Sequence, residues 1–137
     1  MSSRSFVPIV LTACFVAGVA AAQRNPPLVI DSMVGRDLFD FYCATCHGRD
    51  GKGAGPVAAA LKTPPADLTI IAKRNGGRFP RGEVIAFVTD EKSPSVAHGP
   101  REMPVWGPIF RALDPSDIRA KVRIDNLVTY IESIQAK

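Results

Sequence analysis

The sequence predicts an all-α fold of four to five helices joined by long loops. Apolar residues recur every three or four positions, the spacing of one helix face, near residues 33–46, 81–89 and 115–135. No stretch alternates apolar and polar residues as a half-buried strand does, and no segment repeats. The 12 prolines and 11 glycines divide the 137 residues into short elements, and this length predicts one compact domain.

The first predicted helix runs from about Met33 to Cys46, with Ser32 placed to cap its first turn. Shorter helical segments are predicted at residues 57–61 and 67–73, where prolines and glycines mark the breaks between them. The apolar face expected for the first helix consists of Val34, Leu38, Phe41 and Tyr42.

The last predicted helix begins at a strong start signal. Asp114 is placed as its N-cap and Pro115 as its first helical residue, and the helix is expected to end near Gln135. One side of this helix is apolar, and we expect that stripe to be buried. Its members are Ile124, Leu127, Val128, Ile131 and Ile134, with Tyr130 alongside.

The first 22 residues have the layout of a secretory signal peptide. Arg4 precedes an apolar run that ends in three alanines at Ala22, so cleavage would leave residues 23–137 as the mature domain in the periplasm. Two alternatives stay open. The run is at the short end of the ~17–25 residues that span a bilayer, and could stay as an anchor facing the periplasm. Residues 11–14 also resemble a lipoprotein signal that would lipidate Cys14, although the apolar run continues past it.

The charge pattern excludes one class of partner. The chain carries 17 Lys and Arg against 13 Asp and Glu, a net charge of +4. These basic residues are scattered, and no run of them forms the kind of arm that binds nucleic acid, so we expect no nucleic-acid partner. The default interpretation of such scattered charges is a solvated surface, although a mildly basic surface also suits an acidic protein partner.

Two of the three cysteines belong to a motif with a specific chemistry. Cys43-Ala44-Thr45-Cys46-His47 is the C-x-x-C-H pattern of covalent haem attachment. On one helical turn, thiols three residues apart reach the two vinyl groups on one edge of a porphyrin, and the adjacent His47 turns its imidazole toward the iron. The motif therefore predicts one covalent haem c, with His47 as the proximal iron ligand.

Three other sites would use the same residues. A disulfide between Cys43 and Cys46 would close too short a loop to stabilise the domain much. A thioredoxin-like redox pair needs a strand–helix setting and gives His47 no role. A zinc ion held by these three residues and His98 would take ligands from consecutive positions, which a tetrahedral site tolerates poorly. Haem attachment is the interpretation that the residues favour.

The second axial ligand must come from elsewhere in the chain. The candidate thioethers after the signal are Met33 and Met103. Met33 would have to double back from the start of the haem-binding helix, whereas Met103 lies in residues 101–107, where Pro104 and Gly107 predict an irregular loop. Such a loop can place a sulfur over the open haem face, so Met103 is the predicted distal ligand. His98 is the alternative, and would give bis-histidine ligation with a lower reduction potential.

Together these marks resemble the class I, or mono-haem, cytochrome c family in its small bacterial periplasmic form. The likeness extends over about residues 35–134, nearly the whole mature chain. The marks are Gly35, Phe39, Cys43-x-x-Cys46-His47, Gly55-Pro56, Pro64-Pro65-Ala66-Asp67-Leu68, Met103-Pro104-x-Trp106-Gly107 and Tyr130. The resemblance implies the cytochrome c fold, in which the helices and long loops wrap around one haem.

The resemblance also implies roles for particular residues. Gly35 and Phe39 should meet the last helix near Tyr130, where glycine permits a close contact between helices. The Pro56 carbonyl should accept the Nδ1–H of the proximal histidine, a bond that orients the imidazole and tunes the iron. Pro56 and Trp106 are accordingly expected at the haem.

The expected function is single-electron transfer rather than catalysis. A haem with both axial positions filled reorganises little, and its edge near Cys43 and Cys46 should meet redox partners in weak, short-lived contacts. A periplasmic dehydrogenase or a terminal oxidase is the expected kind of partner. The alternatives are a haem enzyme or a gas or redox sensor, in which Met103 would not be bound, and a colourless zinc or disulfide module. Contact with a membrane is expected only if the N-terminus is retained or lipidated.

Overall fold

The computed structural model describes residues 30–89, 103–114 and 116–137, and every regular element in these ranges is helical. The all-α prediction is therefore confirmed, with more and shorter elements than expected. The α-helices are α1 (Gly35–Tyr42), α2 (Ala44–His47), α3 (Ile71–Arg74), α4 (Arg81–Thr89), α5 (Trp106–Leu113) and α6 (Asp117–Ser133). Two 3₁₀ turns, η1 (Ala58–Ala60) and η2 (Leu68–Ile70), lie between α2 and α3.

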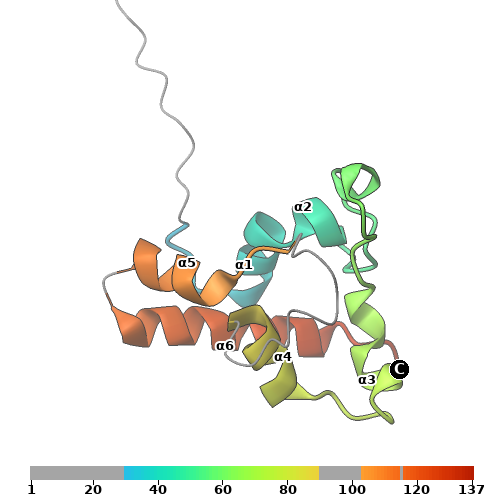
Figure 1. Ribbon diagram of the computed structural model, residues 1–137. Helices are drawn as coiled ribbons and strands as arrows, with labels where there is room; N and C mark the ends of the chain where they lie inside the picture. The colour runs from blue at the N-terminus through green and yellow to red at the C-terminus, as the bar shows by residue number, and fades with distance from the viewer. Residues whose placement is uncertain (1–29, 90–102, 115) are drawn as a thin grey trace, which may run out of the picture.

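Helix α6 is the element on which the other long helices pack. Its 17 residues lie against α1, α4 and α5, as Figure 1 shows. Four members of the predicted apolar stripe are at most 6% exposed, namely Ile124, Leu127, Val128 and Ile131, whereas Ile134 is half-buried. Burying an aliphatic side chain of this size contributes roughly 1.5–3 kcal/mol. The stripe of α6 therefore supplies much of the core that holds α1 and α5 in place.

Helix α1 crosses α6 at close range because its first residue is glycine. A Cβ on Gly35 would overlap the Asn126 carbonyl oxygen and lie 2.9 Å from the Cβ of Tyr130. One turn later, the fully buried Phe39 packs its ring against Tyr130, with 5.2 Å between ring centroids. The contact between these residues that the family resemblance implies is confirmed.

Replacing Gly35 with alanine should destabilise the fold. The added methyl group has no room beside the Asn126 carbonyl, so α1 must move away from α6, at a cost of about 1–3 kcal/mol in the free energy of unfolding. Gly82→Ala in α4 is the matched control. A Cβ there meets no atom within 4 Å, and alanine favours a helix over glycine by roughly 0.5–1 kcal/mol. Denaturant unfolding measures both, and equal stability of the two variants would contradict the close contact.

The first helix begins differently from its prediction. In place of the one helix predicted over residues 33–46, the structure has two, α1 and α2, which lie on either side of Cys43. Val34 holds the N-cap position of α1 without a side-chain hydrogen bond. Ser32, the predicted cap, accepts a hydrogen bond from the Val34 backbone N–H at 3.1 Å and donates to the Asp37 carboxylate at 2.6 Å. The serine therefore orders the approach to the helix rather than its first turn.

The buried face of α1 agrees with the predicted one at Leu38 and in part at Tyr42, which packs against the core, and differs from it elsewhere. Leu38 and Phe39 are fully buried, whereas Val34 and Phe41 are 59% and 43% exposed. Helix α6 covers the side of α1 that carries Phe39, because Gly35 permits the close approach there. The long-range helix contact, rather than the local spacing of apolar residues, selects the buried side.

Helix α5 forms where the sequence predicts an irregular loop. Trp106 and Gly107 begin this helix, inside the stretch 101–107 that was expected to lack regular structure. Pro108 does not prevent helix formation, because it lies in the first turn, where backbone N–H groups have no intrahelical acceptor. Met103 itself lies before the helix, as predicted for a residue in a loop.

The start of α6 is set by Ser116 rather than by Asp114. The Ser116 hydroxyl accepts a hydrogen bond from the backbone N–H of Arg119 at 3.3 Å, so the predicted N-cap Asp114 is wrong. The residue between them lies outside the described ranges. The Asp114 carboxylate instead accepts from the Ser116 backbone N–H at 3.0 Å and from Arg119 Nε at 2.9 Å. It also lies 3.6 Å from the guanidinium of Arg123, which is 2% exposed.

We expect the Asp114 carboxylate to make stability depend on pH. The hydrogen bond from the Ser116 backbone, followed by contributions from Arg119 and Arg123, lowers the pKa of Asp114 below its ordinary value of 3.8. A group of this kind stabilises the fold above its unfolded-state pKa, and the benefit is lost as the pH falls through the folded-state pKa. Asp114→Asn should therefore lower the thermal midpoint at neutral pH and match the wild type well below pH ~3.9. A midpoint difference that stays constant from neutral to acid pH would contradict this assignment.

Some sequence predictions concern residues outside the described ranges. These are the signal peptide at residues 1–22, the retained or lipidated alternatives with Cys14, and His98 as an iron or zinc ligand. They stay predictions. Among the residues that the structure describes, no helix is both long and apolar enough to cross a membrane.

Candidate functional site

The C-x-x-C-H motif lies at the junction of α1 and α2. The Cys43 carbonyl accepts the backbone N–H groups of Cys46 at 3.1 Å and of His47 at 2.9 Å, so the motif forms one helical turn. Cys43 is 8% exposed, Cys46 is half-buried, and both are free thiols. The two sulfurs and the imidazole therefore project from a single turn of chain, the arrangement that covalent haem attachment uses.

Burial determines the chemical state of Cys43. Loss of hydration, with a smaller contribution from the charge of Cys46, raises the pKa of the Cys43 thiol to about 12. Nucleophilic cysteines of redox pairs instead have a lowered pKa, because the thiolate is the species that reacts with disulfides. In this respect the buried Cys43 thiol differs from such a nucleophile.

A backbone carbonyl holds His47 in one orientation. Its Nδ1 lies 2.9 Å from the Ala66 carbonyl oxygen, and the residue is 9% exposed. A carbonyl can only accept, so Nδ1 carries a proton in this bond, and in the neutral tautomer Nε2 is then the nitrogen with the lone pair that binds iron. The expected acceptor, the Pro56 carbonyl, is wrong. Pro56 is exposed, and the neighbouring Val57 donates its N–H to the Thr45 carbonyl at 3.2 Å, which keeps that segment on the backbone of α2.

The glycine-rich loop after the motif explains why Ala66 is the acceptor. The Gly53 N–H donates to the His47 carbonyl at 2.7 Å, and the Leu68 N–H donates to the Gly51 carbonyl at 2.7 Å. A Cβ on Gly53, where φ is +85°, would overlap the carbonyl oxygen of the residue before Ala66. Glycine at this position therefore lets the second backbone segment pass beside the loop and brings the Ala66 carbonyl to the imidazole.

Met103, the predicted distal ligand, lies half-buried against the hydrophobic core in the segment that leads into α5. Just after it, Trp106 packs against Tyr42, the residue before Cys43, with ring centroids 5.3 Å apart. Trp106 also stacks on Phe110 at 5.7 Å. These aromatic contacts connect the Met103 segment to the helix that carries the haem motif. Contact of Trp106 with the haem itself stays a prediction.

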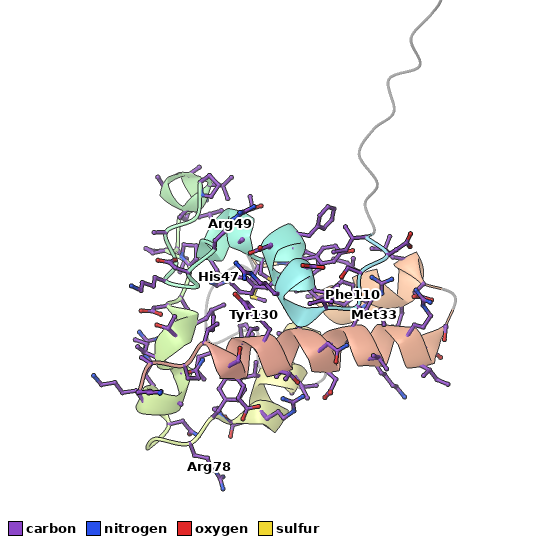
Figure 2. All side chains as sticks on the ribbon, turned by 180° about the vertical axis from the view of Figure 1, so that it is seen from behind. Met33, His47, Arg49, Arg78, Phe110 and Tyr130 are labelled. Carbon is purple, nitrogen blue, oxygen red and sulfur yellow. The ribbon has the colours of Figure 1, made fainter. Side chains whose placement is uncertain are left out.

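Met33, the other candidate thioether, lies at the opposite end of α1 from His47, as Figure 2 shows. Its carbonyl accepts a hydrogen bond from the Asn126 amide at 2.8 Å, which fixes this part of the chain on α6. The eight residues of α1 separate Met33 from the motif. This position argues against Met33 as a ligand of the same iron, and Met103 as the distal ligand stays a prediction.

The donor set of the motif fits a haem. Two thiols on one turn, next to a histidine held by a backbone carbonyl, are the groups that hold a c-type haem. Within residues 30–89, 103–114 and 116–137, no three His, Cys, Asp or Glu side chains converge where they could share a metal ion. Cys43, Cys46 and His47 would bind the porphyrin and its iron from one side.

Sequence reasoning did not assign the roles of three residues that shape the site. The Ala66 carbonyl orients His47, Gly53 makes room for it, and Gly107, the second residue of α5, lies in close contact with the end of α4. Ala66 lies in the segment 64–68, which is one mark of the family resemblance. The resemblance singles out this segment but does not say what Ala66 does. The need for glycine at positions 53 and 107 becomes visible only when the second backbone segment is in place.

Comparison with known proteins agrees with the chemistry of this site. Residues 31–131 match the family model described as cytochrome C oxidase, cbb3-type, subunit III, a span that contains the motif, Ala66 and Met103. No curated protein and no solved structure matches the chain. A cytochrome c domain implies haem c and haem-based electron transfer. The chain belongs to this family of class I, mono-haem c-type cytochrome domains.

Proposed function

We propose that the chain carries one haem c attached through Cys43 and Cys46, with His47 and Met103 as axial ligands, and that it passes single electrons between partner proteins. The observation that carries the proposal is the state of His47. Its Nδ1 is hydrogen-bonded to the Ala66 carbonyl, which holds the ring on the same helical turn as two free thiols. In the neutral ring with the proton on Nδ1, Nε2 is the nitrogen that can bind iron.

Each residue of the proposed site has its own role. When bound, haem c supplies a one-electron couple between ferric and ferrous iron. Cys43 and Cys46 would anchor the group to one turn, and the Ala66 carbonyl orients His47 by accepting the hydrogen bond from its Nδ1–H. Met103 is a soft sulfur ligand that favours the reduced state, which gives a relatively high reduction potential. Two permanent ligands leave no open position for a substrate.

The proposed setting is the periplasm, after removal of the signal peptide at residues 1–22. Support comes from the N-terminal sequence pattern and from the oxidising, export-linked context of covalent haem. The description of the matching family names an oxidase subunit, which supports a terminal oxidase as one partner, with a periplasmic dehydrogenase as the other class. Attachment to a membrane would follow from retention of the N-terminus or from a lipid on Cys14.

Spectroscopy with carbon monoxide tests the proposal against its rivals. Holoprotein from a host that attaches c-type haem should show, when ferric, the weak red charge-transfer band of methionine-ligated haem. When ferrous, it should bind carbon monoxide poorly, because Met103 occupies the distal position. Rapid and complete carbon monoxide binding without this band would contradict Met103 ligation. That outcome would favour a haem enzyme or a sensor with an open distal position.

A further inference from the structure

Helix α5 begins directly against the end of helix α4. A Cβ on Gly107, the second residue of α5, would lie 2.7 Å from the carbonyl oxygen of Thr89 and 3.0 Å from its Cα. Thr89 is the last residue of α4, is 5% exposed, and donates its hydroxyl to the Ile85 carbonyl at 2.9 Å. It therefore has little room to move. Backbone packs on backbone at this point, and glycine is the residue that fits at position 107 without displacing a helix.

This contact holds one side of the segment that carries Met103. Only two residues separate Met103 from Trp106, and Gly107 follows at once. Trp106 is tied to α1 through its ring contact with Tyr42, and Gly107 is tied to α4 through Thr89. The first turn of α5 is thus held by contacts with both α1 and α4. A displacement of that turn is transmitted to Met103, since the connection is too short to absorb it.

We propose that Gly107 is a positioning residue for Met103, because it lets α5 rest directly on the last residue of α4. The inference deepens the proposed function and rests on it, since it concerns how the proposed distal ligand is held. A methyl group at position 107 must push α5 away from Thr89, and the Met103 sulfur moves with it. Ligand geometry has to be held within about 0.5 Å, so a shift of this kind weakens the bond between sulfur and iron.

Gly107→Ala holoprotein tests the inference by spectroscopy and potentiometry. We expect the methionine–iron band of the ferric protein to be much weaker than in the wild type. Imidazole added to the solution should displace Met103 at about tenfold lower concentration, the size of effect seen when the support of a metal ligand is lost. The reduction potential should fall with the weakened sulfur bond. Each measurement reports on the ligand itself rather than on activity.

Two control variants separate positioning from general stability. Gly82→Ala adds the same methyl group to α4, where no atom lies within 4 Å, and should leave the band and the imidazole affinity unchanged. Arg81→Ala removes the contacts of α4 with Asp125 at 2.7 Å and Glu132 at 3.0 Å on α6, without touching α5. It should lower stability but keep the band. Equal weakening of the band in Arg81→Ala and Gly107→Ala would overturn the positioning role.

A second pair of variants serves if Gly107→Ala does not accumulate as holoprotein. Thr89→Ile enlarges the side chain whose Cβ would lie 3.1 Å from a Cβ on Gly107, and should weaken the band. Thr89→Ser keeps the hydroxyl that bonds to the Ile85 carbonyl and should leave the band unchanged. An unchanged band and potential in Gly107→Ala, or in Thr89→Ile, would overturn this inference and leave the proposed function standing. Absence of the band from the wild type would contradict Met103 ligation, and with it both proposals.

Discussion

Replacing Met103 with alanine is expected to lower the reduction potential by on the order of 0.2 V, a fraction of the roughly 0.8 V over which axial ligands set haem potentials. The reason is the loss of a soft sulfur ligand that favours ferrous iron. The ferrous variant should also bind carbon monoxide rapidly, because its distal position is open. Potentiometry and carbon monoxide titration of the purified holoprotein measure the two effects.

Met33→Ala is the matched control for that variant. Met33 is the other half-buried methionine of the described residues, but it precedes α1, at the end of the helix away from His47 (Figure 2). Its removal should leave the potential and the carbon monoxide response as in the wild type. If Met103→Ala behaves like the wild type and Met33→Ala does not, the assignment of the distal ligand is wrong.

The second large effect is expected from Gly53→Ala. A Cβ at this position would overlap the carbonyl oxygen before Ala66, in the segment that accepts the Nδ1 proton of His47. Loss of this bond makes the imidazole a weaker donor to ferric iron, so the potential should rise by a few tens of millivolts, where about 59 mV corresponds to a tenfold change. The melting temperature of the holoprotein should fall as well. Both are measured on the protein with haem attached.

Gly76→Ala controls for the backbone strain in that variant. Gly53 and Gly76 have φ values of +85° and +65°, so alanine is disfavoured at both by roughly 1–2 kcal/mol. Only at Gly53 does the methyl group meet another segment, since nothing lies within 4 Å of a Cβ at Gly76. Gly76→Ala should therefore lose stability with no change of potential. Equal potentials in the two variants would show that the Ala66 carbonyl does not tune His47.

The sequence predicts the helices whose own residues determine them. The range 81–89 is that of α4, and the apolar stripe of α6 is buried as its spacing indicates. Predictions fail where contact with a distant segment determines which side chains are buried. The position of α6 buries Phe39 and exposes Phe41, although both belong to the same short helix. The start of α5 is missed because Pro104 and Gly107 predict a loop there, whereas the contacts of Trp106 and Gly107 with other helices form only in the folded chain.

In the candidate site, too, the sequence predicts some features and misses others. The roles of Cys43, Cys46 and His47 follow from side-chain chemistry at fixed spacing, which a sequence displays directly. The acceptor for His47 is a backbone carbonyl, and every residue has one, so residue identity does not distinguish Ala66 from Pro56. The choice depends on how the glycine-rich loop and the following segment pack together, which is a property of the folded chain.

Intact mass under denaturing conditions tests most directly whether Cys43 and Cys46 carry one covalent haem. The protein is expressed in a host that attaches c-type haem, next to a second cytochrome that confirms the host is competent. We predict the mass of residues 23–137 plus one haem for the wild type, and no haem on Cys43→Ser/Cys46→Ser. A haem-free wild-type mass, while the second cytochrome carries its haem, would contradict covalent attachment and assign the two cysteines another role.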